Sequence, residues 1–531
     1  MPSASLSISA GLFLLCVWLF SKFFLNASRG VTTTRLRGPP RTNLILGLSE
    51  FTLQSVSMSG AYEEWATRYG AVYAVPTALG RQKIIVTDST ALLHVYNAER
   101  TVYEKPKSDR KFLGEMFGHG IAWAEGDEHK RQRKALSPAF SNAAIRKLTP
   151  VFQDSTHKVK STWDDLIESP EGAIIDVQKW LNAIGLDSIG IAGFAHDFHV
   201  LDGERSPVTA VFEALEHANI NSFDTVVLIL SFVFPIMSSL PTRRTRLFWE
   251  LRRTLEEIAG RMLEDTRREK EVGVVDGMRD KSLIGLLLKA GLKDSEMRMT
   301  PEEVASQMNV LLLAGYETSS ASLTWTLMEL AWHPEIQEKL RKELSQGGDC
   351  DDATWDQLTY ELPYLDAVVL EALRVHPVVT ELGREAIRDD IIPLGTPIVT
   401  ASGETVSNIT IAKGSTVVTP IRCINRSEAF WGPDAKIFRP ERWLEPITGQ
   451  AKDLQGHRHL LTFHDGCRAC IGKGFALAEM KAVLSILVRH FTFEFPDGLD
   501  TKVETHVTIV VRPKVAGQDG TKVPLRVKRV E

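Results

Sequence analysis

The strongest helix signal of the chain lies near the middle of the sequence. Thr300, Pro301 and Glu303 have the pattern of a helix start, with threonine as N-cap, proline at the first helical position and glutamate closing a capping box. The helical pattern then runs to His333, and Pro334 ends it. A helix of this length measures about 50 Å, enough to cross a whole domain. Because its apolar residues form one stripe, we expect a buried central helix.

The composition is that of one large folded unit. The chain has 531 residues, of which 44% are hydrophobic, so it can bury a large core. Strand-like runs occur at 71–75, 83–87, 396–419 and 505–512, and most of the rest has helical patterns. We therefore predict a mainly α fold with a smaller β part. The net charge of -5 argues against nucleic-acid binding, and five scattered cysteines do not suggest a disulfide-stapled secreted chain.

An apolar run from Leu6 to Leu25 lies near the start of the chain, with Lys22 as its only charge. A helix of this length spans about 30 Å, the thickness of the hydrocarbon core of a bilayer. Arginines follow the run and no basic residue precedes it, a bias that keeps the rest of the chain in the cytosol. We expect residues 1–28 to be one transmembrane anchor, 29–50 a linker containing proline and arginine, and 51–531 the main domain. A cleaved signal peptide is the alternative, but it usually has a positive start and a shorter apolar core.

Cys467 and Cys470 form a C-x-x-C pair in the segment FHDGCRACIG, residues 463–472. A zinc site would need a second such pair, covalent haem attachment would need a histidine after Cys470, and a redox dithiol would need a surrounding βαβ pattern. The sequence supplies none of these. A helix-like run begins at Phe475, and a cysteine just before a helix favours the thiolate. Together with Arg468, which can pair with an anionic group, this thiolate fits a flat, dianionic, metal-centred partner such as haem.

The same segment resembles the haem-binding loop of the cytochrome P-450 family, F-x-x-G-x-R-x-C-x-G. All five fixed positions are met, by Phe463, Gly466, Arg468, Cys470 and Gly472. The resemblance implies the fold of that family, haem b as cofactor and Cys470 as the axial ligand of the iron. Cys467 stands where the family often has proline, and we expect it to be a small buried residue.

Further motifs of the family follow in the family's order. Glu371 and Arg374 form its E-x-x-R, which by itself would be an ordinary helix-surface pair. The resemblance adds Arg442 from the segment FRPERW and implies a buried structural network of the three charges.

The resemblance also implies residues that bind the haem propionates. His129 and Arg133 stand where the family commonly has W-x-x-x-R, with histidine replacing tryptophan, and Arg384 is a third candidate, ten residues after Arg374. The neighbouring basic residues have two open interpretations, solvated charge or a docking site for an acidic partner; they are Lys130, Arg131 and Lys134.

The segment AGYETS in the central helix matches the oxygen-activation motif of the family. The resemblance implies that Gly315 makes room for dioxygen, that the hydroxyl of Thr318 assists its activation and that Glu317 helps to deliver protons. Without the family context, a threonine in a helix usually bonds the carbonyl four residues earlier.

Substrate contacts are predicted from resemblance alone, and each is also a plausible core residue. They are Phe112, Met116, Phe117, Leu311, Leu312, Val378, Val379 and Leu382. Their apolar character predicts a lipophilic small molecule, and terpenoid-like secondary metabolism is a suggestion from fungal members of the family.

The resemblance predicts a monooxygenase in the endoplasmic reticulum membrane, with its catalytic domain in the cytosol. The chain has no room for a flavin or nicotinamide domain, so electrons must come from another protein. We expect NADPH–cytochrome P-450 reductase, with cytochrome b5 as a second donor, and no nucleic acid. Two alternatives remain: a family member that rearranges or dehydrates its substrate without oxygen, and a non-catalytic haem sensor or carrier.

Overall fold

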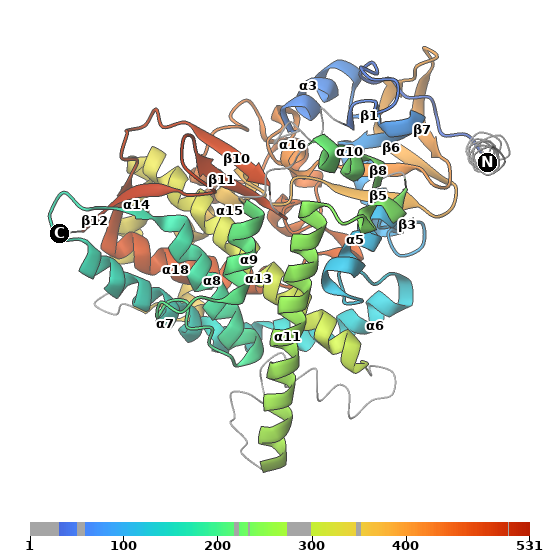
Figure 1. The fold of residues 1–531 in the computed structure, drawn as a ribbon. Helices are drawn as coiled ribbons and strands as arrows, with labels where there is room; N and C mark the ends of the chain where they lie inside the picture. The colour runs from blue at the N-terminus through green and yellow to red at the C-terminus, as the bar shows by residue number, and fades with distance from the viewer. Residues whose placement is uncertain are drawn as a thin grey trace, which may run out of the picture.

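The computed structural model describes residues 31–49, 59–216, 222–231, 234–272, 299–346, 352–507 and 509–530. Strands from residues 72–86 and 382–419 gather at one side of the molecule with the described N-terminal segment, and the other side holds most of the helices together with the C-terminal strands (Figure 1). The mainly α fold with a smaller β part is therefore confirmed. Among the described residues, no helix combines the length and the apolar character that crossing a membrane requires. The predicted anchor, residues 1–28, lies outside the described residues.

The largest sheet has five strands in the order β1-β2-β8-β5-β3. Its strands are β1 (Val72–Pro76), β2 (Gln82–Val86), β8 (Thr416–Thr419), β5 (Leu382–Ala386) and β3 (Tyr103–Glu104). Only β2 and β8 are parallel neighbours. Side chains alternate between two cores, because Ile84 and Val86 point into the main core while Ile85 packs with Tyr62 and Trp65 of α3 (Ser59–Tyr69).

The remaining strands form three small antiparallel sheets. They are β6 (Asp390–Val399) with β7 (Thr405–Ile411), β10 (Val503–Val507) with β11 (Val511–Val515), and β4 (Ala173–Asp176), β12 (Pro524–Arg529) and β9 (Phe491–Glu494) in the order β4-β12-β9. Strands thus occur in all four regions where the sequence predicted them.

The described part of the predicted linker packs on the sheet side of the molecule. The amide of Ala74 donates to the carbonyl of Arg37 at 2.9 Å, and the amide of Thr34 donates to the carbonyl of Thr410 at 2.9 Å. Leu36 is buried in the main core. Residues 31–49 are therefore in contact with the main domain.

The central helix is α13 (Pro301–Trp332), and its start has the predicted capping box between Thr300 and Glu303. The expectation of a single apolar stripe was wrong, because most residues of α13 are buried on all sides. Its polar residues are accommodated within the helix: the hydroxyls of Thr324 and Thr326 donate to carbonyls four residues earlier, at 2.7 and 2.8 Å.

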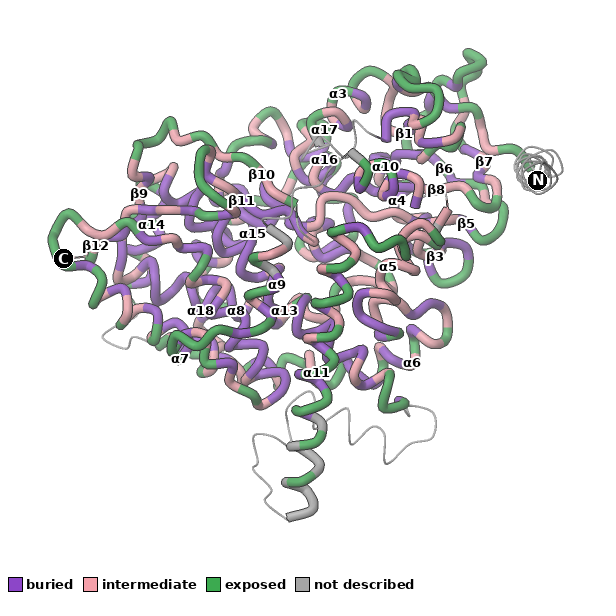
Figure 2. The backbone as a smooth tube through the Cα atoms, in the orientation of Figure 1, coloured by how far each residue is buried: buried purple, intermediate pink, exposed green. Residues whose placement is uncertain are grey.

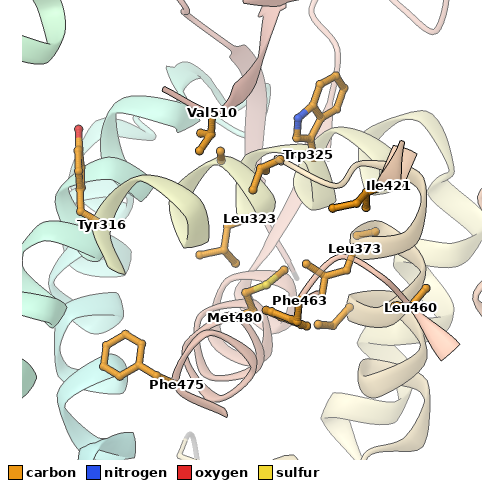
Figure 3. Packing of buried hydrophobic residues seen from close by; sticks show 14 of the residues in the cluster. Tyr316, Leu323, Trp325, Leu373, Ile421, Leu460, Phe463, Phe475, Met480 and Val510 are labelled. Atoms are coloured by element: carbon orange, nitrogen blue, oxygen red, sulfur yellow. The ribbon is translucent and has the colours of Figure 1, made fainter. Parts of the chain in front are cut away.

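The other helices either pack directly against α13 or lie farther from it in the molecule (Figure 2). They are α4 (Ser89–Ala98), α5 (Lys107–Phe117), α6 (Gly126–Leu136), α7 (Asn142–Leu166), α8 (Val177–Phe194), α9 (Pro207–Glu216), α10 (Ser222–Ser231), α11 (Arg243–Val272), α14 (Pro334–Ser345), α15 (Pro363–Val375), α16 (Ile421–Asn425), α17 (Glu428–Trp431) and α18 (Lys473–His490). Figure 3 shows the core where α13 passes α18 and α15: Leu323 lies near Met480, and Phe463 lies near Leu373.

Candidate active site

The predicted haem-binding loop is a tight turn that ends at α18. The amide of Cys470 donates to the carbonyl of Phe463 at 2.8 Å, which closes the loop, and Phe463 is buried in the core. Gly466 has φ +66°, and a Cβ there would lie 2.9 Å from the carbonyl oxygen of Tyr96, so the turn requires glycine. Gly472 has φ -84° and open surroundings, so its backbone does not demand glycine.

Cys470 lies directly before α18, as predicted, with the backbone N–H groups of Gly472 and Lys473 directed at its sulfur. Burial nevertheless raises the pKa of the Cys470 thiol, and these amides and Arg133 only partly oppose that rise. The helix end alone therefore does not give a thiolate, and a metal cation would supply the missing compensation. Cys467 is half-buried, which is less than the sequence predicted.

The sulfur of Cys470 faces a large cavity. Cys470 is exposed although it lies deep in the protein, and it lines a cavity of about 1910 Å³. Of the eight predicted substrate contacts, Phe112, Met116 and Leu382 line this cavity. The other five are not among its lining residues and are buried or half-buried core side chains: Phe117, Leu311, Leu312, Val378 and Val379.

Sequence reasoning missed apolar lining residues that come from other parts of the chain. Val227 and Ile229 belong to α10 and Phe248 belongs to α11. Val511 is the first residue of β11, and Ile509 lies two residues before it. The apolar run of α10 was a usable signal, but nothing local indicated that it reaches the same cavity as α5.

Cationic side chains gather at the same cavity. Its lining includes the four predicted carboxylate-binding residues, His129, Arg133, Arg384 and Arg468. Burial lowers the pKa of His129 to about 3, with further lowering by Arg468 and Lys105. His129 is therefore neutral at pH 7, and it can donate one hydrogen bond to a carboxylate but brings no positive charge.

Lys105 is a further basic residue at the cavity, beside Arg468, and sequence reasoning missed it. Its ammonium lies 2.9 Å from Oε1 of Glu125, which also binds Arg468. Burial, followed by the nearby charge of Arg468, lowers the pKa of Lys105 to about 8. A lysine between a short strand and Pro106 was the only sequence signal, and it is a weak one.

The middle of α13 has one face that is less buried than the rest. Ala314 is exposed and Gly315 and Thr318 are half-exposed, whereas Tyr316 and Glu317 are buried. The hydroxyl of Thr318 donates to the carbonyl of Ala314 at 2.7 Å, the bond expected of any helical threonine. Its oxygen can still accept a hydrogen bond on the open side.

Helix packing requires a glycine at position 315, and the sequence did not reveal this requirement. A Cβ at this position would lie 2.7 Å from a side-chain carbon of Ile189, so glycine allows α8 to approach α13 closely. Glu317 forms a buried ion pair with Arg512 of β11, at 3.3 Å, and is not among the residues that line the cavity.

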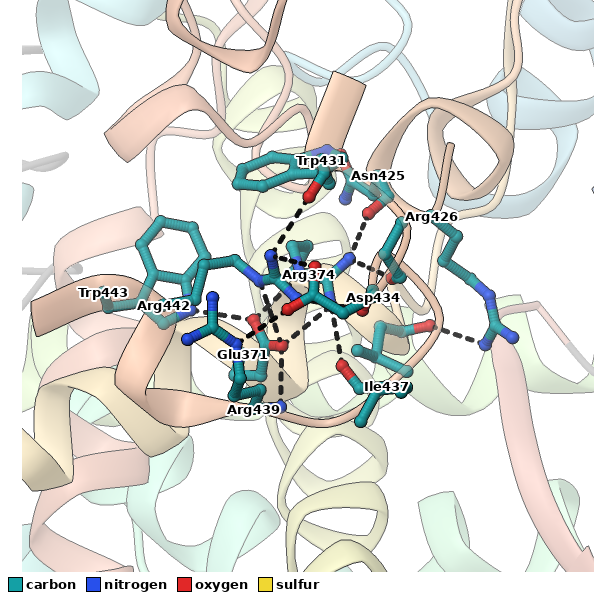
Figure 4. Close-up of polar contacts among 12 residues, drawn as sticks. Glu371, Arg374, Asn425, Arg426, Trp431, Asp434, Ile437, Arg439, Arg442 and Trp443 are labelled. Carbon is teal, nitrogen blue, oxygen red and sulfur yellow. Dashed lines mark hydrogen bonds and ion pairs between the residues drawn. The ribbon is translucent and has the colours of Figure 1, made fainter. Parts of the chain in front are cut away.

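The structure brings Glu371, Arg374 and Arg442 together in a buried network (Figure 4). Glu371 lies 2.8 Å from Arg374 and 3.5 Å from Arg442, and the indole of Trp443 donates to it at 2.9 Å. The shorter ion pair of Arg442 is with Asp434, at 2.9 Å. Trp443 and Asp434 are further members that sequence reasoning missed.

The basic run beside His129 divides into two kinds of residue. Arg131 forms a bidentate pair with Glu303 at the start of α13, so it joins α6 to the central helix. Lys130 and Lys134 are exposed, as solvated charge or a docking surface would require.

The residues of the cavity fit a haem group. The thiol of Cys470 faces the cavity and suits an iron centre. The arginines that line the cavity suit the carboxylates of haem. Apolar side chains from α5, α10 and α11 also line the space, together with polar and charged residues of the same helices. Such an arrangement can hold a cofactor and an apolar molecule side by side.

The chain resembles known proteins over most of its length. A family model described as cytochrome P-450 matches residues 37–518. Cytochrome P-450 monooxygenase claP of Ampulloclitocybe clavipes is 54% identical over 525 residues, covering 98% of each chain. Cytochrome P-450 monooxygenase claQ of the same organism is 53% identical over 522 residues, covering 98% of this chain and 97% of its own. Cytochrome P-450 monooxygenase 205 of Postia placenta is 34% identical over 521 residues, covering 94% of each chain.

Proposed function

The chain belongs to the cytochrome P-450 family, whose members bind haem through a cysteine thiolate, and we propose that it is a monooxygenase acting on a lipophilic small molecule. The observation that carries the proposal is the thiol of Cys470, which faces a large cavity with apolar walls. Relatives named as monooxygenases support the proposed reaction, in which dioxygen takes up two electrons from a partner reductase and two protons, one oxygen atom enters the substrate and the other leaves as water.

We propose that Cys470 would hold the haem iron through its thiolate and that Arg133, Arg384, Arg468 and His129 would hold the haem carboxylates. When bound, the haem supplies an iron at which dioxygen is reduced and cleaved, and an electron-donating thiolate favours that cleavage. The backbone amides at the start of α18 hold the sulfur of Cys470 in place. The hydrogen bond from the amide of Cys470 to the carbonyl of Phe463 closes the loop and so fixes its backbone.

We assign the protein's own contribution to oxygen activation to the less buried face of α13, whose residues Ala314, Gly315 and Thr318 are exposed or half-exposed but are not among the cavity-lining residues. The hydroxyl of Thr318 is held by the carbonyl of Ala314, so its position is fixed while its lone pairs remain available to a water molecule. Glu317 is buried against Arg512, so in this arrangement it acts on the cavity only through intervening groups. Phe112, Met116 and Phe248 exclude water and favour an apolar substrate.

The partners and the location are part of the proposal. We keep NADPH–cytochrome P-450 reductase as the expected electron donor, cytochrome b5 as a second donor, and the endoplasmic reticulum membrane as the location through the segment 1–28. Secondary metabolism, with a terpenoid-like substrate, remains a suggestion supported only by the likeness to fungal relatives.

The test uses two threonines of the same helix. Thr318→Ala removes the hydroxyl from the less buried face, and Thr326→Ala is the matched control, because Thr326 makes the same bond to a carbonyl four residues earlier but is buried. Loss of such assistance typically costs about 100- to 10,000-fold in rate. We expect Thr318→Ala to keep substrate binding and NADPH consumption through the reductase, while releasing hydrogen peroxide in place of product. Thr326→Ala should form product as the wild type does.

Two results would overturn the proposal. Product formation by the wild type without oxygen and without reductase would indicate a rearranging or dehydrating enzyme. NADPH consumption that does not respond to any substrate, in a protein that binds haem, would favour a sensor or carrier.

A further inference from the structure

Glu99 is a fully buried carboxylate beside the cavity. It caps the C-terminus of α4, and its side chain has 0% exposure. Its Oε1 accepts a hydrogen bond from Nε of Arg384 at 2.8 Å and lies 2.7 Å from Nε2 of His464. Burial by itself raises the pKa of Glu99, but the hydrogen bond from His464 and the charge of Arg384 outweigh it and hold the pKa below its usual value. Glu99 is therefore ionised.

The contacts of Glu99 determine how Arg384 is oriented. Nε of Arg384 is taken by Glu99, and Nη1 donates to the carbonyl of Gly383 at 2.8 Å. His464 Nε2 is closer to the carboxylate of Glu99 than to Nη2 of Arg384, which is 3.1 Å away. Because a carboxylate only accepts, Nε2 carries the hydrogen, and Nη2 of Arg384 keeps its own hydrogens for other partners. Arg384 lines the cavity, so these hydrogens are available to a carboxylate there.

A second carboxylate repeats the arrangement at the neighbouring arginine. Glu125 precedes α6, has a side chain with 6% exposure, and binds Arg468 and Lys105. The cavity-lining cations Lys105, Arg133, Arg384 and Arg468 are thus opposed by two protein carboxylates. Since His129 is neutral, these four cations and the carboxylates of Glu99 and Glu125 have, among themselves, more positive than negative charge, which favours binding of the carboxylates of haem.

We propose that Glu99 is a positioning residue for the cofactor: it orients Arg384 toward a haem carboxylate, and its negative charge sets the electrostatic potential at the iron. His464 supports it from the haem-binding loop, where it holds the left-handed backbone conformation with φ +58°. Glu99 acts on the cofactor through Arg384. The proposal rests on membership of a haem-binding family and not on the proposed oxygenation, so a failed oxygenation assay leaves it intact.

Two substitutions distinguish the orientation of Arg384 by Glu99 from the effect of the negative charge of Glu99. Glu99→Gln keeps the shape and the acceptor for Arg384 but removes the charge, whereas Glu99→Asp keeps the charge but shortens the reach. In the full-length, haem-loaded protein, we expect Glu99→Gln to shift the midpoint potential of the haem iron to a more positive value, because a negative charge near the iron is lost. We expect it to retain haem as the wild type does. Glu99→Asp should keep the potential and lose haem several-fold faster to excess apomyoglobin.

Glu329→Gln is the matched control. Glu329 is likewise a buried, ion-paired carboxylate, bound to His376 at 2.5 Å, but it is eleven residues beyond Thr318 on α13, about 16 Å along the helix, and is not among the lining residues. We expect no shift in the potential from this change. If the midpoint potential shifts no more in Glu99→Gln than it does in Glu329→Gln, the proposal is overturned. Glutamine has nearly the same shape as glutamate, so Glu99→Gln should fold. The midpoint potential of its haem iron therefore tests the proposal even if Glu99→Asp does not fold.

Discussion

The network around Glu371 and the cluster around Arg384 are both built from buried arginines and glutamates, but their charges are balanced in different ways. All five N–H donors of Arg374 are used inside the protein, two by Glu371 and three by backbone carbonyls. Arg384 keeps donors for the cavity, and its cluster has more positive than negative charge. A saturated network indicates a structural role, whereas unused donors and excess charge indicate a site for a ligand.

The largest effect is expected from breaking the saturated network. Glu371→Ala leaves Arg374 without its carboxylate in a position with 0% exposure, and breaking such a buried pair costs about 3–5 kcal/mol. We expect a loss of this size in the free energy of unfolding, measured by urea denaturation, with poor haem retention as a consequence. Glu445→Ala is the control, because its pair with Arg439 is largely exposed and worth at most about 1 kcal/mol. Equal losses in the two variants would mean that the Glu371 network is not the buried, saturated unit described above.

A smaller effect is expected where α13 packs on α8. Gly315→Ala places a Cβ 2.7 Å from Ile189, and overpacking of this kind costs about 1–3 kcal/mol of folding free energy. Gly260→Ala in α11 is the matched control, because nothing lies within 4 Å of its added Cβ and alanine favours the helix by about 0.5–1 kcal/mol. We therefore expect Gly315→Ala to lower the midpoint temperature of thermal unfolding and Gly260→Ala to raise it. A stabilising Gly315→Ala would show that this face of α13 is not tightly packed.

The smallest effect on folding is expected on the cavity side. Lys105→Gln leaves Glu125 bound to Arg468, so no buried charge loses its last partner, and we expect a change of about 1 kcal/mol in the free energy of unfolding, the usual net contribution of one hydrogen bond. Its effect should instead appear in haem retention. The pKa of Lys105 is lowered to about 8, so the ammonium is present below that pH and lost above it. Haem release from the wild type should therefore accelerate as the pH rises from about 7 to 9.

Lys105→Arg provides the control for this pH dependence, because arginine stays charged throughout the range. Haem release from Lys105→Arg should stay slow across these pH values. A wild-type protein and an arginine variant with the same pH profile would show that Lys105 does not contact the cofactor's carboxylates.

The sequence was most informative where the chemistry is local. The loop from Phe463 to Gly472 and the capping box at Thr300 were predicted in place, because each depends on residues a few positions apart. The mainly helical class and the strand regions also followed from local periodicity. The role predicted for Gly315 was local too, yet its packing partner Ile189 lies on another helix and could not be seen.

What the sequence did not reveal depends on contacts between distant segments. Glu99 and Arg384 are 285 residues apart, and no local pattern joins them. Arg512 gave no signal that it would pair with Glu317, and Arg131, part of a basic run, proved to bind Glu303 inside the protein. Of the eight residues predicted to contact substrate, five are not among those that line the cavity, and its apolar lining comes partly from distant segments that no local pattern connects.

The central claim is that the thiol facing the cavity holds the haem, and one spectrum tests it. The carbon-monoxide complex of the reduced protein should show the red-shifted Soret band of haem-thiolate proteins. Cys470→Ser should abolish that band, because Cys470 faces the cavity, and Cys467→Ser, three residues earlier in the same loop, should retain it. Loss of the band in Cys467→Ser with its retention in Cys470→Ser would contradict the assignment of the ligand and the site built around it.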